Sequence, residues 1–123
     1  MRYKVSIPDN AKYACIHVTE TIDPSLAQEI MEEMVRIQNQ NDLQRFLLDV
    51  REVHSQTSPF DDYDLAYERV RSSELSRIIK VALLRSPSDT THRFAEIVGR
   101  NAGHNITLFE DMDVAVAWLQ DDT

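Results

Sequence analysis

The chain has 123 residues, the usual length of one domain, and we expect residues 1–123 to form a single domain. Hydrophobic residues make up 42% and charged residues 28%, values typical of a globular protein rather than a disordered one. The 21 acidic and 13 basic side chains give a net charge of −8, which repels nucleic acid backbones and anionic lipid surfaces. We therefore expect neither a nucleic acid partner nor membrane insertion.

Cysteine content and the beginning of the chain indicate the compartment. Cys15 is the only cysteine, so an intrachain disulfide and a cysteine-based metal cluster are excluded. Residues 1–8 lack the apolar run of a signal peptide, and every apolar stretch is far shorter than a membrane span. We expect a cytoplasmic location.

Two short alternating segments begin the chain. Residues 2–7 alternate between polar and apolar side chains, as in a half-buried strand. Residues 8–10 favour a turn, which ends this segment. Residues 12–19 alternate again, so the short connection predicts an antiparallel hairpin. A helix is expected next, begun by Asp23-Pro24 and ended by the polar run 38–42. Its apolar side chains recur at helical spacing: Leu26, Ile30, Met34 and Ile37.

The rest of the chain alternates strands with helices. Strands are expected at 44–50, 78–84 and 105–109. One helix follows Ser58-Pro59, another carries Phe94 and ends at Gly103, and a short final helix is capped by Asp111. The order β-β-α-β-α-β-α-β-α requires crossovers, which are nearly always right-handed. We predict an α/β domain whose mostly parallel five-stranded sheet has its strands side by side in sequence order.

The two faces of this sheet differ in composition. Alternate positions of each strand face opposite sides of the sheet, and one of these two sets (one parity) is apolar throughout: Ala14, Ile16, Val18, Phe46, Leu48, Val50, Ile79, Val81 and Leu83. The other parity is mixed and includes Tyr13, Cys15, His17, Leu47 and Ala82. Successive right-handed crossovers place every helix on one side, so we expect the helices predominantly on one face. The mixed face then lies open to a protein partner, or to a second copy of the chain in a homodimer.

From residue 46 to residue 119 the pattern is similar to the SpoIIAA-like group of the STAS (sulphate transporter and anti-sigma factor antagonist) superfamily. Three segments carry the resemblance: Phe46-Leu47-Leu48-Asp49-Val50-Arg51, Ile79-Lys80-Val81-Ala82-Leu83-Leu84, and Leu108-Phe109-Glu110-Asp111 running into Ala117-Trp118-Leu119. The order of elements matches as well. The resemblance implies a SpoIIAA-like fold and a non-enzymatic regulatory or protein-interaction domain.

Ser58 has two interpretations. In the anti-sigma factor antagonists of this family, a serine at the start of the helix after the third strand is phosphorylated by a partner kinase, in an Asp-Ser-Ser-Gly motif. The matching stretch here is Thr57-Ser58-Pro59-Phe60, in which only Ser58 corresponds. Considered by itself, Ser58 forms a capping box with Asp61. A phosphate would be repelled there by neighbouring acidic side chains, so the helix cap is favoured over a phosphorylation site.

The densest polar cluster is the loop of residues 85–93, which follows the fourth strand. Open α/β sheets bind ligands at the carboxyl ends of their parallel strands. Candidate contacts for a small anionic or amphipathic ligand are Arg85, Ser86, Ser88, Thr90, Thr91 and His92. The alternative is an ordinary capped and solvated loop, and the absence of glycine from it excludes the known phosphate-wrapping loops.

The sequence assembles neither a catalytic nor a metal centre. Cys15 and His17 share a strand face, but a zinc site needs four ligands and the other histidines lie on distant segments. Alternate strand residues also point in parallel, which argues against a nucleophile–base pair. Asp49 is expected to form a salt bridge with a nearby cation: Arg51, Lys80 or Arg85. We predict that the domain is not an enzyme and uses no cofactor or metal.

Two functions from different classes remain. The first is a regulatory domain that binds a protein partner or a second copy of itself. The second is a binding protein for a small anionic or amphipathic ligand, held by the loops at the carboxyl ends of the parallel strands.

Overall fold

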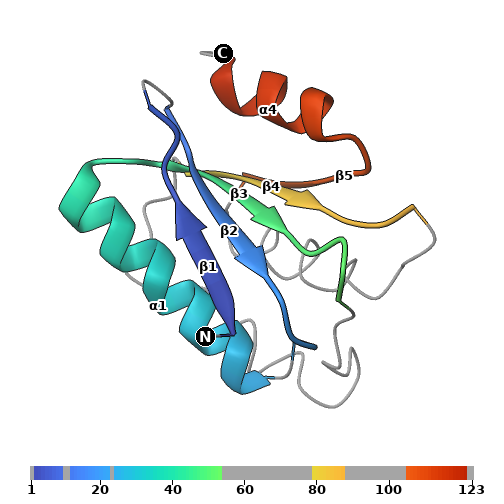
Figure 1. Ribbon diagram of the computed structural model, residues 1–123. Coiled ribbons are helices and arrows are strands. Elements are labelled where there is room, and N and C mark those ends of the chain that lie inside the picture. The colour runs from blue at the N-terminus through green and yellow to red at the C-terminus, as the bar shows by residue number, and fades with distance from the viewer. Residues whose placement is uncertain (1, 10–11, 23, 54–78, 88–104, 122–123) are drawn as a thin grey trace.

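The computed structural model describes residues 2–9, 12–22, 24–53, 79–87 and 105–121. This part of the chain contains the following elements in order: β1 (Tyr3–Ser6), β2 (Ala14–Val18), α1 (Pro24–Asn41), β3 (Arg45–Asp49), β4 (Lys80–Leu84), β5 (Asn105–Phe109) and α4 (Met112–Gln120). The strands form one sheet in the order β1-β2-β3-β4-β5 (Figure 1). Only the β1–β2 pair is antiparallel. The predicted α/β class and strand order are confirmed. The two helices expected between β3 and β5 lie outside the described residues.

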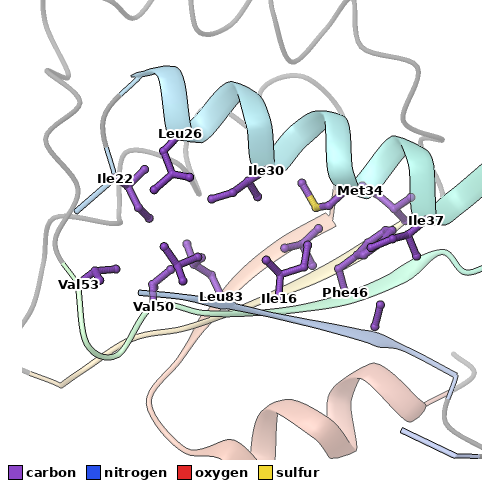
Figure 2. Packing of buried hydrophobic residues seen from close by; sticks show 14 residues of the cluster. Ile16, Ile22, Leu26, Ile30, Met34, Ile37, Phe46, Val50, Val53 and Leu83 are labelled. Carbon is purple, nitrogen blue, oxygen red and sulfur yellow. The ribbon is translucent and has the colours of Figure 1, made fainter. Parts of the chain in front are cut away.

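The first hydrophobic core lies between α1 and one face of the sheet (Figure 2). The helical stripe predicted from the sequence is buried there: Leu26, Ile30, Met34 and Ile37. The sheet contributes the apolar parity, including Ile16, Phe46 and Leu83. The apolar residues of α1 recur with the 3.6-residue period of a helix, and those of the strands with the two-residue period of a strand, so both sets face this layer. The predicted helical stripe and the predicted apolar sheet face are confirmed.

Helix α1 ends where the sequence turns polar. Asp42, the residue after Asn41, has φ = 53°, the left-handed conformation that commonly ends a helix. This turn reverses the chain toward β3. Helix α1 thereby connects β2 to β3 and returns the chain along the sheet, as the crossover between two parallel strands requires.

Helix α4 lies on the opposite face of the sheet from α1 (Figures 1 and 2). A second core lies beneath it. Ala115 and Leu119 of α4 are fully buried there against Leu47, Ala82 and Leu84. The expectation that every helix lies on one side of the sheet is therefore wrong for α4. The rule on handed crossovers constrains only helices that connect two parallel strands, whereas α4 follows the last strand and is free to pack on either face.

Both ends of α4 are satisfied by side chains. At its N-terminus the Asp111 carboxylate accepts a hydrogen bond of 3.1 Å from Val114 N, which confirms the predicted cap. At its C-terminus the Arg45 guanidinium donates to Leu119 O at 2.5 Å. Lys80 Nζ donates to Trp118 O at 2.9 Å. Arg45 and Lys80 are register partners on β3 and β4, so the start of these strands presents a pair of cations to the negative end of the helix.

Candidate functional site

Helix α4 covers part of the face that was predicted to be open. Leu47 and Ala82 are 0% exposed and Tyr13 is buried with them in the core beneath α4, so these three residues are not a bare surface. Cys15 and His17 on β2 are half-buried. The correction has a simple cause, because the side chains that gave this face its apolar character are those that α4 needs for its own core. The homodimer expected on this face stays a prediction.

Two sequence features pointed to this arrangement. Leu84 is apolar although it shares the mixed parity of Leu47 and Ala82, and it is fully buried beneath α4. The final helix also carries buried side chains that require an apolar partner surface. Taken together, they indicate a second core over β3 and β4, with the polar positions left on the β1–β2 side.

Among the described residues, three ion pairs lie at the carboxyl edge of the parallel strands and form the candidate site. They join Asp49 to Arg51, His17 to Glu52, and Arg85 to Glu110. Their side chains come from the ends of β2, β3, β4 and β5, which meet at one edge of a parallel sheet. Main-chain pairing continues past the strand ends, where Val50 N donates to Leu84 O and Arg85 N donates to Phe109 O, both at 2.9 Å. These bonds hold the edge in a fixed arrangement.

The pair of Asp49 and Arg51 is bidentate. Arg51 Nε donates to Oδ1 of Asp49 at 3.0 Å, and its terminal nitrogen donates to Oδ2 at 2.9 Å. Arg51 N also donates to Oδ1 at 3.2 Å. Burial by itself raises the pKa of the Asp49 carboxyl, but the hydrogen bonds and charge of Arg51 outweigh it and leave the pKa below its usual value. The carboxylate therefore stays ionised and fixes the turn after β3.

The pair of His17 and Glu52 connects β2 to the same turn. His17 Nε2 lies 3.1 Å from Oε2 of Glu52, a residue 35 positions away. His17 is the register partner of Asp49, so it lies beside both acidic groups. Cys15, two residues earlier on the same face, has its pKa raised by burial and then by the negative charge of Asp49. The Cys15 thiol is thus kept protonated rather than activated as a nucleophile.

The loop proposed for ligand binding is described only at its start. Arg85 pairs with Glu110 at 3.2 Å, and Ser86 is half-buried beside it. Four of its candidate contacts lie outside the described residues: Ser88, Thr90, Thr91 and His92. Ser58 also lies outside them.

The described residues present charged groups of both signs at this edge. Among the described residues, no group of three or more His, Cys, Asp and Glu side chains is placed to hold a metal ion. None of the described helices is long and apolar enough to cross a membrane. The edge instead offers alternating positive and negative side chains on a rigid sheet. Sequence reasoning named Asp49, Arg51, Arg85 and His17 but missed Glu52 and Glu110 as their partners, since both pairs join segments far apart in the chain.

Solved structures resemble this fold, whereas no family model and no curated protein matches the chain. An anti-sigma factor antagonist from Mycobacterium paratuberculosis superposes with a TM-score of 0.61 and 15% identity, over 97% of this chain and 93% of that one. An uncharacterised protein with a SpoIIAA-like fold from Shewanella loihica superposes with a TM-score of 0.54 and 14% identity, over 95% and 91% of the two chains. The chain therefore has the SpoIIAA-like fold that the resemblance in its sequence implied.

Proposed function

We propose that this SpoIIAA-like domain is a non-enzymatic regulatory module that binds a protein partner at the carboxyl edge of its parallel strands. The observation that carries the proposal is the row of three ion pairs at that edge. Each pair keeps one or both members accessible: the side chains of Arg51, Glu52 and Glu110 are 47%, 67% and 50% exposed. Complementary charges of this kind set the orientation and rate of protein association.

The same pairs favour a protein over a small anion as the bound species. The two guanidinium groups that the structure describes at the edge contact carboxylates, Arg51 with Asp49 and Arg85 with Glu110. A free anion would have to displace those carboxylates in a chain of net charge −8. A protein surface carries both signs of charge and can pair with either member of each ion pair. Binding of a small anionic or amphipathic ligand remains the second hypothesis.

The fold likeness supports the regulatory part of the proposal. One structural neighbour is an anti-sigma factor antagonist. Ser58 follows residues 51–53 in the sequence and corresponds to the serine that is phosphorylated in the anti-sigma factor antagonists. We include in the proposal that Ser58, as a helix cap or as a modified residue, lies next to the partner contact.

The test begins with a partner and ends with a measured affinity. The domain is purified from its own host, and co-purifying proteins and phosphorylated residues are identified together by mass spectrometry. The strongest candidate is then produced pure, and its binding is measured by calorimetry against Glu52→Lys and Glu110→Lys. Truncating or reversing a charge at a protein interface typically costs ~1–3 kcal/mol, so we expect about a tenfold or greater loss of affinity.

Glu32→Lys is the matched control, because it makes the same charge reversal on an exposed residue of α1. The proposal predicts unchanged affinity for this variant. Equal losses for all three variants would indicate a general effect of net charge, and no loss for either edge variant would contradict the proposed site. Turnover of a small substrate by the pure domain would contradict its non-enzymatic character.

A further inference from the structure

Strand β1 is an edge strand that pairs on one side only. It lies antiparallel to β2, and among the described residues no strand lies on its other side (Figure 1). Thr19 N donates to Arg2 O at 3.1 Å, so these two residues form a hydrogen-bonded pair of the β1–β2 ladder. Hydrogen-bonded and non-hydrogen-bonded pairs alternate along an antiparallel ladder. The even-numbered residues of β1 therefore point their main-chain groups toward β2, whereas Tyr3 and Val5 point theirs outward.

The outward-pointing positions also carry apolar side chains. Tyr3 and Val5 are half-buried against the first core. Ile7 directly follows β1 and continues its alternation, but its side chain is 41% exposed. Such an edge, with unpaired main-chain groups and an exposed isoleucine, is a template for pairing with a further strand. The edge thus offers both hydrogen bonds and apolar area to a strand that lies beside it.

A second copy of β1 fits this edge when a two-fold axis passes through Val5. An axis perpendicular to the sheet makes the two strands antiparallel and keeps their corresponding faces on the same side. Residues that lie opposite each other then share a face, so the axis must pass through one residue of the strand. With the axis at Val5, this residue lies opposite its own copy and Tyr3 lies opposite Ile7 of the second copy. The outward N–H and C=O groups of these residues pair across the axis.

The same register avoids like charges. Lys4 lies opposite Ser6 of the second copy, whereas an axis through Lys4 would place two lysines opposite each other, which destabilises a strand pair. An axis through Ser6 would place Tyr3 opposite Asp9, an exposed turn residue. Pro8 lacks an N–H, but it has the parity of the residues that point toward β2. Neither the lysine nor the proline, which often protect an edge strand, opposes this pairing.

We propose that the outer edge of β1 is a dimerisation surface, at which a second copy adds its own β1 and joins two five-stranded sheets into one. The homodimer predicted for the mixed face is thereby assigned to the edge of the sheet. The inference goes beyond the proposed function and does not depend on it. Because the two β1 strands are antiparallel, the carboxyl edges of the two copies point in opposite directions and both stay accessible to a partner.

The side of α1 next to β1 carries charges of both signs. Arg2 lies 3.7 Å from Glu29, and Arg36 pairs with Glu33. In the dimer the two α1 helices lie on the same face of the joined sheet, and these internal ion pairs limit the repulsion between two chains of net charge −8. Pairing through one short strand buries little surface, which suits a weak and reversible dimer.

The first test measures whether the outer edge of β1 becomes covered. Sedimentation equilibrium should show a monomer at about 10 µM and a growing fraction of dimer toward about 1 mM, as expected for a small interface. Amide hydrogen exchange, followed by NMR over the same range, should slow at Val5 as the concentration rises, because its N–H is then bonded to the second copy. Exchange at Lys4, whose N–H points toward β2, should not change.

The second test changes the charges opposite each other in the proposed register. Ser6→Lys places a like charge opposite Lys4 of the second copy on both sides of the axis, and should weaken the dimer about fivefold. Combining it with Lys4→Glu should restore the affinity. Asn105→Lys is the matched control, since it makes a comparable change at an exposed position of β5, the other edge strand, and should leave the affinity unchanged. Circular dichroism should show equal folding, because all three side chains are exposed.

Three results would overturn the proposal. The first is a wild-type protein that stays monomeric up to about 1 mM. The second is a dimer in which exchange at Val5 does not depend on concentration. The third is a dimer that Ser6→Lys weakens no more than Asn105→Lys does. None of these results bears on the carboxyl edge, where Glu52→Lys separately tests the proposed function.

Discussion

Lys80 and Trp118, 38 residues apart, form the contact that fixes the end of α4 on the sheet. Lys80 Nζ lies 4.8 Å from the centre of the Trp118 ring and donates to Trp118 O at 2.9 Å and to Asp121 O at 3.1 Å. The Trp118 ring also packs against Phe109 of β5, with 5.3 Å between the ring centres. One ammonium group thereby satisfies the last carbonyls of α4, compensates the helix dipole and holds an aromatic ring.

Replacing Lys80 by methionine should loosen this end of α4. Lys80→Met keeps the aliphatic stem and removes the charge, so the loss of the cation–π contact and the charged hydrogen bonds should lower the free energy of unfolding by ~1–2 kcal/mol. Trp118 is the only tryptophan, and its fluorescence should shift to the red. Lys4→Met, at an exposed position of β1, is the control and should change neither quantity. Equal behaviour of the two variants would show that the Lys80 contact does not hold α4.

Phe46 and Leu47 are neighbours in β3 that belong to different cores. Phe46 packs beneath α1 and Leu47 beneath α4, and both are fully buried. Phe46→Ala should cost about 3–5 kcal/mol and Leu47→Ala about 2–5 kcal/mol of stability. Hydrogen exchange in the native state should separate them: Leu47→Ala should speed exchange in α4 more than in α1, and Phe46→Ala the reverse. Faster exchange in α1 alone for both variants would contradict a sheet covered on both faces.

Because of the pair of Asp49 and Arg51, we expect the free energy of unfolding to depend on pH. Because Arg51 holds the pKa of Asp49 below its usual value, the pair stabilises the folded state at any pH above the unfolded pKa of about 3.9. That stabilisation is lost as the pH falls through the lower pKa of the folded state. Asp49→Asn should therefore cost ~1–2 kcal/mol near pH 7, a modest value because Arg51 is partly exposed, and progressively less in acid.

Denaturant unfolding of the wild type and Asp49→Asn between pH 2 and pH 7 measures this difference. Asp9→Asn, in an exposed turn, serves as the control and should change stability by less than about 0.5 kcal/mol at every pH. A difference between wild type and Asp49→Asn that stays constant down to pH 2 would contradict the ionised pair.

The reactivity of Cys15 should report the same carboxylate. Burial and the charge of Asp49 raise the pKa of the Cys15 thiol, and only the thiolate reacts with iodoacetamide. The alkylation rate of the folded protein should therefore reach its midpoint at a higher pH than that of free cysteine. Asp49→Asn should move the midpoint to lower pH, because it removes one of the two causes. A midpoint that moves upward in Asp49→Asn would contradict this assignment.

Periodicity predicted the elements and the first core, but it did not assign α4. The apolar stripe from Leu26 to Ile37 and the alternation in β3 each indicate which side of the element is buried. Because α1 connects two parallel strands, the right-handed crossover rule also determines the face of the sheet on which α1 packs. Helix α4 follows the last strand, and only the apolar residues Leu47 and Leu84 on the mixed parity indicated where it packs.

Register explains which of the predicted salt bridges formed. Asp49 ends β3 opposite Leu84, whereas Lys80 lies opposite Arg45 at the other end of the strand pair. Arg51 was therefore the partner of Asp49, and Lys80 was available to α4. The contact of His17 with Glu52 depends on the pairing of β2 with β3, which a single sequence does not state residue by residue.

Site-specific photo-crosslinking in the cell of origin shows whether a partner protein binds at the carboxyl edge. A benzophenone side chain is placed at Glu52, on the carboxyl edge, and separately at Gln40, an exposed position near the end of α1. The account predicts one protein crosslinked through position 52 and not through position 40, and that protein should bind the pure domain less tightly when Glu52 is changed to Lys. Equal crosslinking from both positions, or none from position 52, would contradict a partner site at the carboxyl edge of the sheet.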